Sequence, residues 1–381
     1  MKGKEWKTHH PGGSNRVIVT KMLPGNRWLK LLVDADCRVD VCLSSEALDI
    51  AEIETAIGDR CDGVIGQLTE AWGEILFTAL KAAGGKVYSN YAVGFNNVDL
   101  PAATRCGIPV GNTPGVLTET TAEMAVALTF AAARRLGEAE RFLREGRFKG
   151  WLPTLFVGEL LRGKTLGVIG AGRIGSAYAR MMVEGHKMNL VYFNRRENRA
   201  LEAYVTAYAG FLDARGEVPV SCRRADSVEE LLQTADCVSI HTVLDDTTRH
   251  LINSKRLSLM KENAILINTS RGPVIDEAAL VFHCQSHPDF RAGLDVFEDE
   301  PLLKPGLSSL ENVVIVPHIA SATMWTRQGM ATLAASNVAG IIRGYGVWNK
   351  PDIKFFLADT PPKAAPSILN AKELGMRIWD E

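Results

Sequence analysis

The sequence has no long apolar run, and it has no excess of charge of either sign. No hydrophobic stretch among the 381 residues approaches the roughly 20 residues that a helix needs to span a bilayer. The 43 Lys and Arg residues nearly balance 44 Asp and Glu, for a net charge of −1. The first absence argues against a membrane protein. The second gives no electrostatic reason to expect nucleic acid or an anionic membrane as a partner.

Disulfide and metal patterns are missing as well. The seven cysteines are scattered without a C-x-x-C pair, and none sits in a metal-ligand pattern. An odd, dispersed set is typical of reduced thiols, so we expect a reducing compartment and no metal. Residues 1–16 have no apolar signal core, and the chain ends in Trp379-Asp380-Glu381, not in the peroxisomal Ser-Lys-Leu. We therefore expect a soluble protein of the cytosol or an organelle matrix, the mitochondrion included.

The sequence does contain a repeated alternation of short apolar runs and helical segments. Its 46% hydrophobic residues and 34 glycines are typical of an α/β protein, and its length allows two domains. A helix is expected at 69–81. Strands are expected at 31–33, 39–41, 63–66, 85–88, 237–241, 264–268, 292–297 and 313–318. This alternation predicts Rossmann-like, doubly wound parallel sheets with ligands beyond the carboxyl ends of their strands.

One stretch has the form of a dinucleotide-binding β-α-β unit. The apolar run 165–169 ends in Gly170-Ala171-Gly172-Arg173-Ile174-Gly175, a helix-compatible segment follows, and a second apolar run covers 188–193. The three glycines suit the tight turn, the approach of the pyrophosphate and the close packing of helix on strand. Free N–H groups at the helix start favour the phosphates. The stretch therefore predicts a nicotinamide cofactor.

Asn194-Arg195-Arg196 follows the second strand, where an acid normally receives the ribose hydroxyls. A carboxylate would repel a 2′-phosphate, whereas a neutral amide beside two guanidiniums could accept it. This reading favours acceptance of NADPH. In the other reading both arginines are solvated surface charges and the cofactor is NADH.

Helical segments flank the β-α-β unit. Thr120-Thr121-Ala122-Glu123 has the form of a capping box before a long apolar helix expected at 122–136. Residues 197–227 have helical spacing but weak caps and read as an insertion. Three roles are open for Trp151: it lines a substrate pocket, it contacts a second subunit, or it packs within its own subunit. A last helix is expected at 331–344, in a tail that returns to the first domain and makes it discontinuous.

Three strand ends supply an arginine, a glutamate and a histidine: Arg271, Glu300 and His318. A carbonyl that accepts a hydride needs a proton donor, and histidine titrates closest to neutral pH. Glu300 would orient the ring and favour its protonated form, while Arg271 would hold a substrate carboxylate. Taken one at a time, Arg271 could be a surface charge, Glu300 an acidic residue in a turn and His318 a histidine packed in the core. Together, downstream of the glycine loop, they predict a catalytic set.

These motifs resemble the D-2-hydroxyacid dehydrogenase family, and within it most the plant-type hydroxypyruvate (glycerate) reductases. The family match is carried by the glycine loop and by the segments Ser270–Glu277, Gly293–Pro301 and Val316–Ser321. The plant-type features are Gly66–Thr69, Gly111–Glu119 and Gly150–Pro153. One departure is Asn194, where plant-type enzymes usually have Asp, and another is the missing peroxisomal tripeptide.

The resemblance implies a flavodoxin-like substrate domain from residues 1–120 and 322–381, a dinucleotide-binding domain at 121–321, and a homodimer. It implies reduction of hydroxypyruvate to D-glycerate with NADH or NADPH, of the photorespiratory type, with glyoxylate to glycolate as a secondary activity. The alternative within the family is another D-2-hydroxyacid dehydrogenase, such as a glyoxylate reductase. The alternative from another class is a non-catalytic, NAD(H)-sensing corepressor-like module. Measurable turnover would distinguish an enzyme from such a module.

The resemblance also implies roles for single residues. His318 becomes the proton donor and acceptor, Glu300 its partner and Arg271 the substrate clamp. The backbone of Val93 and Gly94 corresponds to a loop that holds the substrate carboxylate; from the residues alone, a turn without a ligand is the other reading. A tryptophan like Trp151 reaches the partner subunit's pocket in related reductases. The residues placed along the cofactor, besides the glycine loop and 194–196, are Thr121, Thr269, Asp295 and His318.

Overall fold

A computed structural model of the chain describes residues 4–379 and divides it into two compact units. The split unit comprises residues 1–117 and 322–381, and the central unit comprises residues 118–321. The assignment of a substrate and a cofactor to these units, with the expected boundaries at 120 and 321, stays a prediction. Residues 380 and 381, on which the reading of the C-terminal tripeptide rests, lie outside the described residues.

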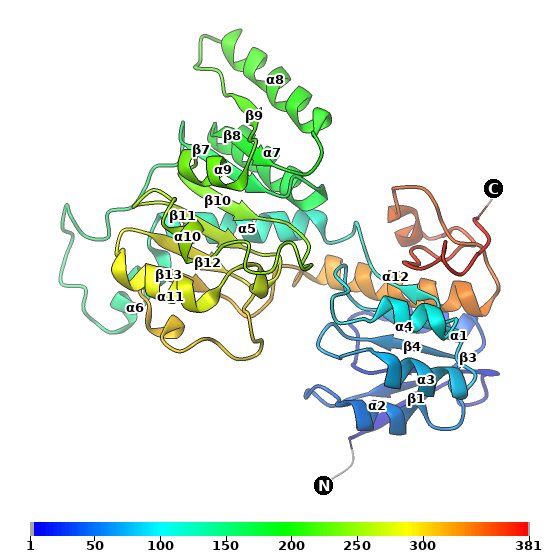
Figure 1. Ribbon diagram of the computed structural model, residues 1–381. Coiled ribbons are helices and arrows are strands. Elements are labelled where there is room, and N and C mark those ends of the chain that lie inside the picture. The colour runs from blue at the N-terminus through cyan, green and yellow to red at the C-terminus, as the bar shows by residue number, and fades with distance from the viewer. Residues whose placement is uncertain (1–3, 380–381) are drawn as a thin grey trace. The chain divides into compact units, whose positions relative to one another are not determined.

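The central unit is built on a parallel seven-stranded sheet (Figure 1). Its strand order, β13-β12-β11-β10-β7-β8-β9, places the point where the order reverses between β7 and β10. In open α/β sheets, ligands bind beyond the carboxyl ends of the strands at such a point. The strands are β7 (Thr165–Ile169), β8 (Asn189–Phe193), β9 (Cys222–Arg224), β10 (Cys237–Ile240), β11 (Ile265–Asn268), β12 (Arg291–Leu294) and β13 (Val313–Ile315).

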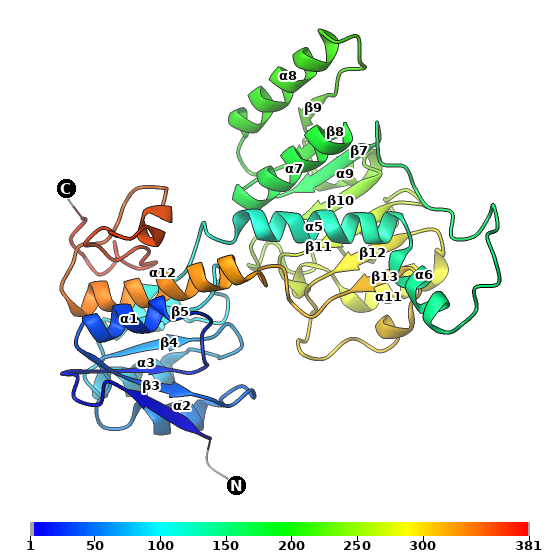
Figure 2. The same cartoon turned by 180° about the vertical axis from the view of Figure 1, so that it is seen from behind.

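Helices cover both faces of this sheet, so each face has its own apolar core. One core joins the sheet to α5, α7 and α8, and the other joins it to α9, α10 and α11. Figure 2 shows α5 and α7 in front of the strands. The helices of the central unit are α5 (Thr118–Ala133), α6 (Leu136–Arg144), α7 (Arg173–His186), α8 (Arg199–Asp213), α9 (Val228–Thr234), α10 (Ser254–Leu257) and α11 (Glu277–Ser286), with short 3₁₀ turns η1 (Gly272–Val274) and η2 (Leu307–Ser309).

The split unit contains a six-stranded sheet in the order β1-β3-β2-β4-β5-β6. From β3 to β6 the strands are parallel and follow the flavodoxin-like order, which confirms the predicted fold class of two doubly wound α/β sheets. Strand β1 pairs antiparallel with β3 and was not expected from the polar amino terminus. The strands are β1 (Trp6–His9), β2 (Asn15–Val19), β3 (Cys37–Cys42), β4 (Gly63–Gly66), β5 (Val87–Asn90) and β6 (Val110–Gly111).

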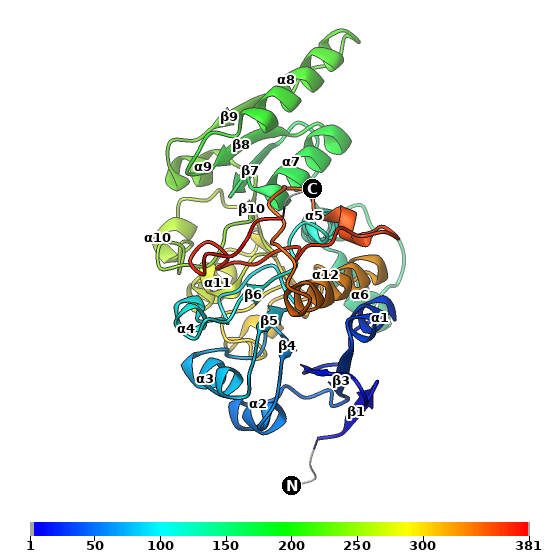
Figure 3. The same cartoon turned by 90° about the vertical axis from the view of Figure 1, so that its right-hand side faces the viewer.

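Helices from both ends of the chain cover the split unit's sheet. Figure 3 shows α2, α3 and α4 on one side of β3, β4 and β5, and α1 and α12 on the other. Helix α12 comes from the carboxyl-terminal segment and buries most of its side chains against α1, β4 and β5. The helices are α1 (Arg27–Asp34), α2 (Ile50–Ile57), α3 (Glu74–Ala82), α4 (Leu100–Arg105) and α12 (Met324–Ile342), with the 3₁₀ turn η3 (Lys354–Leu357).

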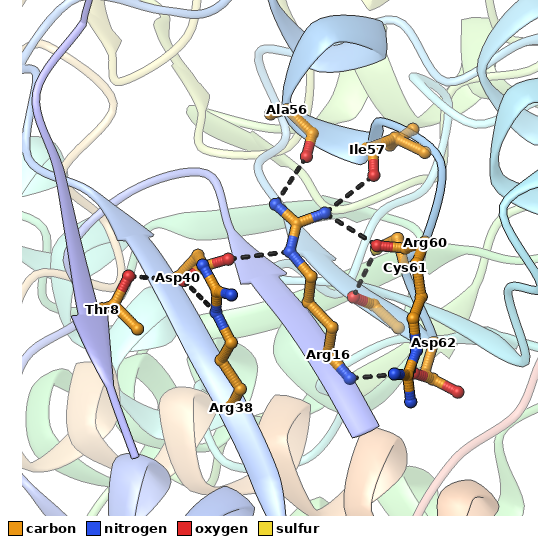
Figure 4. A network of polar contacts seen from close by, with 10 residues as sticks. Thr8, Arg16, Arg38, Asp40, Ala56, Ile57, Arg60, Cys61 and Asp62 are labelled. Atoms are coloured by element: carbon orange, nitrogen blue, oxygen red, sulfur yellow. Dashed lines mark hydrogen bonds and ion pairs between the residues drawn. The ribbon is translucent and has the colours of Figure 1, made fainter. Parts of the chain in front are cut away.

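Arg16 at the start of β2 fixes the end of α2 (Figure 4). Its guanidinium donates to the carbonyl oxygens of Ala56, Ile57 and Arg60 at 2.8–2.9 Å, and its Nε lies 2.8 Å from Asp40 Oδ2. The last carbonyls of a helix have no partner within the helix and carry partial negative charge, so a cation there stabilises the helix end.

Several local expectations were wrong. Residues 31–33 lie in α1, not in a strand. Helix α5 already begins at Thr118, so the expected capping box lies inside it. That helix ends at Ala133, and after the left-handed Arg135 (φ +55°) a separate helix, α6, follows. Helix α8 has a firm amino-terminal cap, because Asn198 accepts a hydrogen bond from the Leu201 N–H at 3.0 Å.

Within residues 4–379, no helix combines the length and apolar character needed to cross a membrane.

Candidate functional site

The glycine loop lies between β7 and α7, at the reversal point of the central sheet. Gly170 has φ +94°, and a Cβ there would lie 2.8 Å from the backbone of His241, at the end of β10. A Cβ on Gly175 would lie 2.2 Å from the Gly170 carbonyl oxygen, so both positions need glycine. A Cβ on Gly172 would meet no protein atom within 4 Å, which leaves the approach to the helix start open. Arg173 and Ile174 are in the first turn of α7, where backbone N–H groups have no partner within the helix.

The 194–196 turn after β8 is held from inside through its carbonyl oxygens. Arg224, on β9, donates from Nε and Nη2 to the Asn194 carbonyl at 3.1 and 2.9 Å, and from Nη2 to the Arg195 carbonyl at 3.3 Å. The Asn194 side chain donates from Nδ2 to the Arg196 carbonyl at 2.9 Å. All three carbonyls of the turn therefore already accept hydrogen bonds. Within the described residues, Arg195, Arg196 and Arg224 form no ion pair, although the charge of Arg224 helps to lower the pKa of Glu197 and the charge of Arg195 helps to lower the pKa of Asp245.

Asn198 fastens this turn to the glycine loop. Its Nδ2 donates to the Ala171 carbonyl at 2.8 Å and lies 3.0 Å from Ser176 Oγ. The segment that is expected to receive the adenosine ribose and the loop that is expected to receive the pyrophosphate are thus directly joined. Sequence reasoning missed both Asn198 and Arg224. An asparagine three residues before an apolar helical position was the available signal for the first.

The structure joins two of the three expected catalytic residues directly. His318 Nδ1 lies 2.9 Å from Glu300 Oε2. Burial is the largest single influence on Glu300 and raises its pKa, but the hydrogen bond and charge of His318, the Phe297 N–H and Arg271 together outweigh it, so the pKa is lowered. The carboxylate therefore stays charged beside the ring.

Arg271 acts on the same pair through its charge. Burial lowers the pKa of Arg271, and the Glu300 carboxylate opposes that shift. A guanidinium remains charged nevertheless. Its Nη1 donates to the Ser270 carbonyl at 2.8 Å.

Two buried side chains shape the turns that carry Arg271 and His318. Asn268 accepts from the Ser270 N–H at 3.0 Å and donates to the Arg271 carbonyl at 2.9 Å. Asp295 is fully buried and accepts from the N–H groups of Ile319 and Ala320 at 2.6 and 3.0 Å. Burial raises the pKa of Asp295, and these N–H groups offset the shift only in part. Asp295 thus holds the turn in which His318 adopts φ +51°.

In the split unit, the loop expected to bind an anion is held by two buried amides. Asn112 donates to the Val93 carbonyl at 2.9 Å, and Asn90 donates to the Gly94 carbonyl at 3.0 Å. Both asparagines are at most 4% exposed. Because these side chains donate hydrogen bonds to the carbonyl oxygens, the backbone groups that the loop offers to a ligand are its N–H donors. The sequence signal was an asparagine that closes, or directly follows, a buried strand.

Trp151 is 81% exposed and lies between α6 and β7. Among the described residues, no hydrogen bond or ring contact links it to Arg271, Glu300 or His318. This exposure does not fit ordinary packing within a single chain, and the role of Trp151 at a pocket or a subunit contact stays a prediction.

The central unit fits a nicotinamide dinucleotide. The glycine turn leaves open space at Gly172, and Thr269, 7% exposed, has a buried Oγ1 without a hydrogen-bond partner in the described protein. Thr121 is also buried, within α5. In residues 4–379, no group of three or more His, Cys, Asp or Glu side chains is placed to hold a metal ion.

Comparison with known proteins gives consistent matches. The family model "D-isomer specific 2-hydroxyacid dehydrogenase, NAD binding domain" matches residues 126–320. The chain is 62% identical over 370 residues to glycerate dehydrogenase of Cucumis sativus, covering 96% of this chain and 97% of the relative. It is 60% identical over 376 residues to peroxisomal glycerate dehydrogenase HPR of Arabidopsis thaliana, covering 98% and 97%.

A solved structure extends the likeness to three dimensions. The NADPH-dependent glyoxylate/hydroxypyruvate reductase of Sinorhizobium meliloti, in complex with NADP and malonate, matches with a TM-score of 0.69 and 29% identity. The match covers 93% of this chain and 98% of the other. The similarity therefore extends over both units.

Proposed function

Because the chain belongs to the D-isomer specific 2-hydroxyacid dehydrogenases, we propose that it reduces hydroxypyruvate to D-glycerate with a nicotinamide cofactor. The observation that carries this proposal is the 2.9 Å contact between His318 Nδ1 and Glu300, in the unit that holds the glycine loop. Identities of 62% and 60% to proteins named glycerate dehydrogenase support the substrate. The name of the S. meliloti reductase supports glyoxylate as a second substrate.

The proposed roles follow from the geometry of the chain's own side chains. A bound nicotinamide supplies the hydride that reaches the substrate C2. With His318 Nδ1 engaged by Glu300, Nε2 is the ring nitrogen that gives a proton to the C2 oxygen. Glu300 stabilises the charged ring and Arg271 holds the substrate carboxylate. For the split unit, we propose that the backbone N–H groups of Val93 and Gly94 bind a substrate carboxylate.

We further propose that NADPH is accepted beside NADH. Asn194 carries no charge, and Arg195, Arg196 and Arg224 lack carboxylate partners within the described residues. A 2′-phosphate placed there would meet three positive charges, none of which has a carboxylate of the described residues within ion-pair distance. The glycine loop, Thr121, Thr269 and Asp295 are assigned to the rest of the cofactor.

Steady-state kinetics with hydroxypyruvate test both proposals. We expect turnover with NADH and NADPH, and slower turnover with glyoxylate. His318→Ala should lower kcat by at least about 100-fold, because general acid catalysis is lost, while the Kd for NADH stays unchanged. Asn194→Asp should shift kcat/KM toward NADH, because the new carboxylate repels the 2′-phosphate.

Activity retained in His318→Ala would contradict the proton-donor role. A strong preference of the wild type for NADH would indicate that Arg195, Arg196 and Arg224 are surface charges without a role in cofactor binding. No turnover with either cofactor would favour the sensing module.

We also propose that the chain forms a homodimer through the segment after α6. This segment exposes apolar side chains that a monomer would leave in water, and Trp151 is 81% exposed. The other large ones are Phe148, Leu152, Val157 and Leu160, joined by Leu143 in the last turn of α6, and each is at least 50% exposed. Sedimentation equilibrium should give twice the mass of 41.5 kDa, and a monomeric mass would contradict the proposal.

We propose that the protein works in a reducing compartment, because its cysteines form no disulfide. All seven are free, and six of them are buried. Cell fractionation should locate the activity in the cytosol or in an organelle matrix, and recovery from an oxidising, secreted fraction would contradict this assignment.

A further inference from the structure

His250 lies between β10 and α10, outside every motif considered above, and it joins two loops that are distant in sequence. Its backbone N–H donates to the Pro273 carbonyl at 2.8 Å. Its ring Nε2 lies 2.7 Å from Glu298 Oε1. One residue therefore connects the turn after β11 to the turn after β12.

These two turns carry two of the three proposed catalytic residues, Arg271 and Glu300. Pro273 comes two residues after Arg271, and Glu298 comes two residues before Glu300. The turns also meet directly, because a Cβ on Gly272 would lie 1.8 Å from the Phe297 carbonyl oxygen. His250 thus fastens the two turns beside the place where their backbones already touch.

Glu298 is a fixed anchor for the histidine. Its side chain is 9% exposed, and its Oε2 accepts from the Glu277 N–H at 3.3 Å. The Glu298 N–H in turn donates to Glu277 Oε2 at 2.6 Å. A carboxylate that is this deeply buried needs its remaining oxygen paired, and His250 provides the hydrogen bond.

The backbone of His250 shows that its surroundings hold it. Its φ of +49° lies in the left-handed region, which a residue with a side chain seldom adopts. Such a conformation persists only where the surrounding contacts impose it. The hydrogen bonds to Pro273 and Glu298 are two such contacts.

We propose that His250 is a positioning residue that sets the distance between Arg271 and the Glu300–His318 pair. The inference rests on the proposed function for the reaction that is measured. A 2-keto acid presents its carboxylate and its C2 oxygen on adjacent carbons. The distance between Arg271, which holds the carboxylate, and His318, which protonates the C2 oxygen, must therefore stay fixed. Misplacement by about 1 Å costs on the order of 100-fold in rate.

Three variants test this proposal with hydroxypyruvate and NADH. His250→Ala should lower kcat/KM for hydroxypyruvate by about 10- to 100-fold, while the Kd for NADH, measured by fluorescence of the apo protein, stays within twofold. His250→Gln should recover most of the activity, because the glutamine amide can donate to Glu298 in place of the ring. Arg249→Ala is the matched control: its side chain is 58% exposed and lies 3.8 Å from the same Glu298 oxygen, so activity should stay within twofold.

Unchanged kcat/KM in His250→Ala would overturn the proposal. So would an equal loss in the Gln variant, or a parallel loss of NADH affinity, since either would indicate a general structural role. A wild type without turnover would refute the proposed function instead. The positioning role would then be tested by whether His250→Ala, but not His250→Gln, weakens binding of oxalate, a two-carbon dicarboxylate, to the protein loaded with NADH.

Discussion

His283, on α11, is a buried histidine outside the proposed site. It is 9% exposed, its ring stacks on His287 with centroids 4.1 Å apart, and it meets Phe290 edge to face. Burial, reinforced by the charge on His287, lowers the pKa of His283 from 6.5 to about 4. The folded protein therefore keeps this ring neutral in mild acid, whereas the unfolded chain protonates it.

This shift predicts a pH dependence of stability. Between about pH 6.5 and pH 4 the unfolded state binds one more proton at His283, so the free energy of unfolding falls as the pH falls, by at most about 3 kcal/mol. Above pH 6.5 this contribution is constant. Urea unfolding at pH 7.5 and pH 5 should show a smaller loss in His283→Gln than in the wild type. An identical loss in both would contradict the assignment.

At the scale of single residues, the sequence predicted Arg271, Glu300 and His318 because each follows an apolar run in a unit that already held a glycine loop. The residues that hold them were not predictable in the same way. Asn268 closes a buried strand and Asp295 directly follows one, but the fold sets their partners, which are backbone groups and, for Asn268, also the Ser270 hydroxyl. His250 carries no local pattern, since both of its partners are more than 20 residues away.

At the scale of elements, the end of α2 depends on one arginine from another strand. Arg16 donates to three carbonyls at or just beyond the end of that helix and pairs with Asp40, whose side chain is 7% exposed (Figure 4). Removing the guanidinium leaves a buried carboxylate and several carbonyls without this donor.

Arg16→Ala should therefore lower the free energy of unfolding of the split unit by about 2–3 kcal/mol. Arg38→Ala is the control, since Arg38 is 43% exposed and has one ion pair with the same Asp40, at 3.1 Å; we expect a loss below about 1 kcal/mol there. Chemical denaturation monitored by circular dichroism measures both. Equal effects of the two variants would show that the helix end does not depend on Arg16.

Elements were predicted where local pattern and tertiary context agree. The expected strand at 39–41 falls within β3, and the expected strand at 63–66 is β4. Residues 31–33 were misassigned because three consecutive apolar residues resemble a strand, whereas Trp28 and Leu32, one turn apart, form the buried face of α1. The break between α5 and α6 depends on the left-handed Arg135, a conformation that no sequence pattern indicated.

At the scale of the whole molecule, the central unit is continuous in sequence and the split unit is not. Helix α12 supplies Asn337, which is fully buried and donates to Ser89 Oγ at 3.3 Å and to the Asn112 carbonyl at 3.0 Å. Without α12, one face of the β4–β5 sheet and the buried face of α1 would be exposed to water.

A chain that ends at Ser321 should therefore keep a folded central unit and lose the split unit. We expect NADH binding within about threefold of the full chain, together with rapid proteolysis within residues 4–117. Limited proteolysis followed by mass spectrometry locates the cleavage sites. Protection of residues 4–117 in the shortened chain would show that α12 is dispensable.

The discontinuity of the split unit also sets an order of events during protein synthesis. At about 5–20 residues per second, a ribosome needs about 10–40 s to add the roughly 200 residues between the first segment and α12. Throughout that time the nascent first segment exposes the apolar surface that α12 will later cover, because α12 has not yet been synthesised. The central unit is completed during the same interval. The nascent chain should therefore engage chaperones that bind exposed apolar segments during this interval, and release from them should coincide with the emergence of α12.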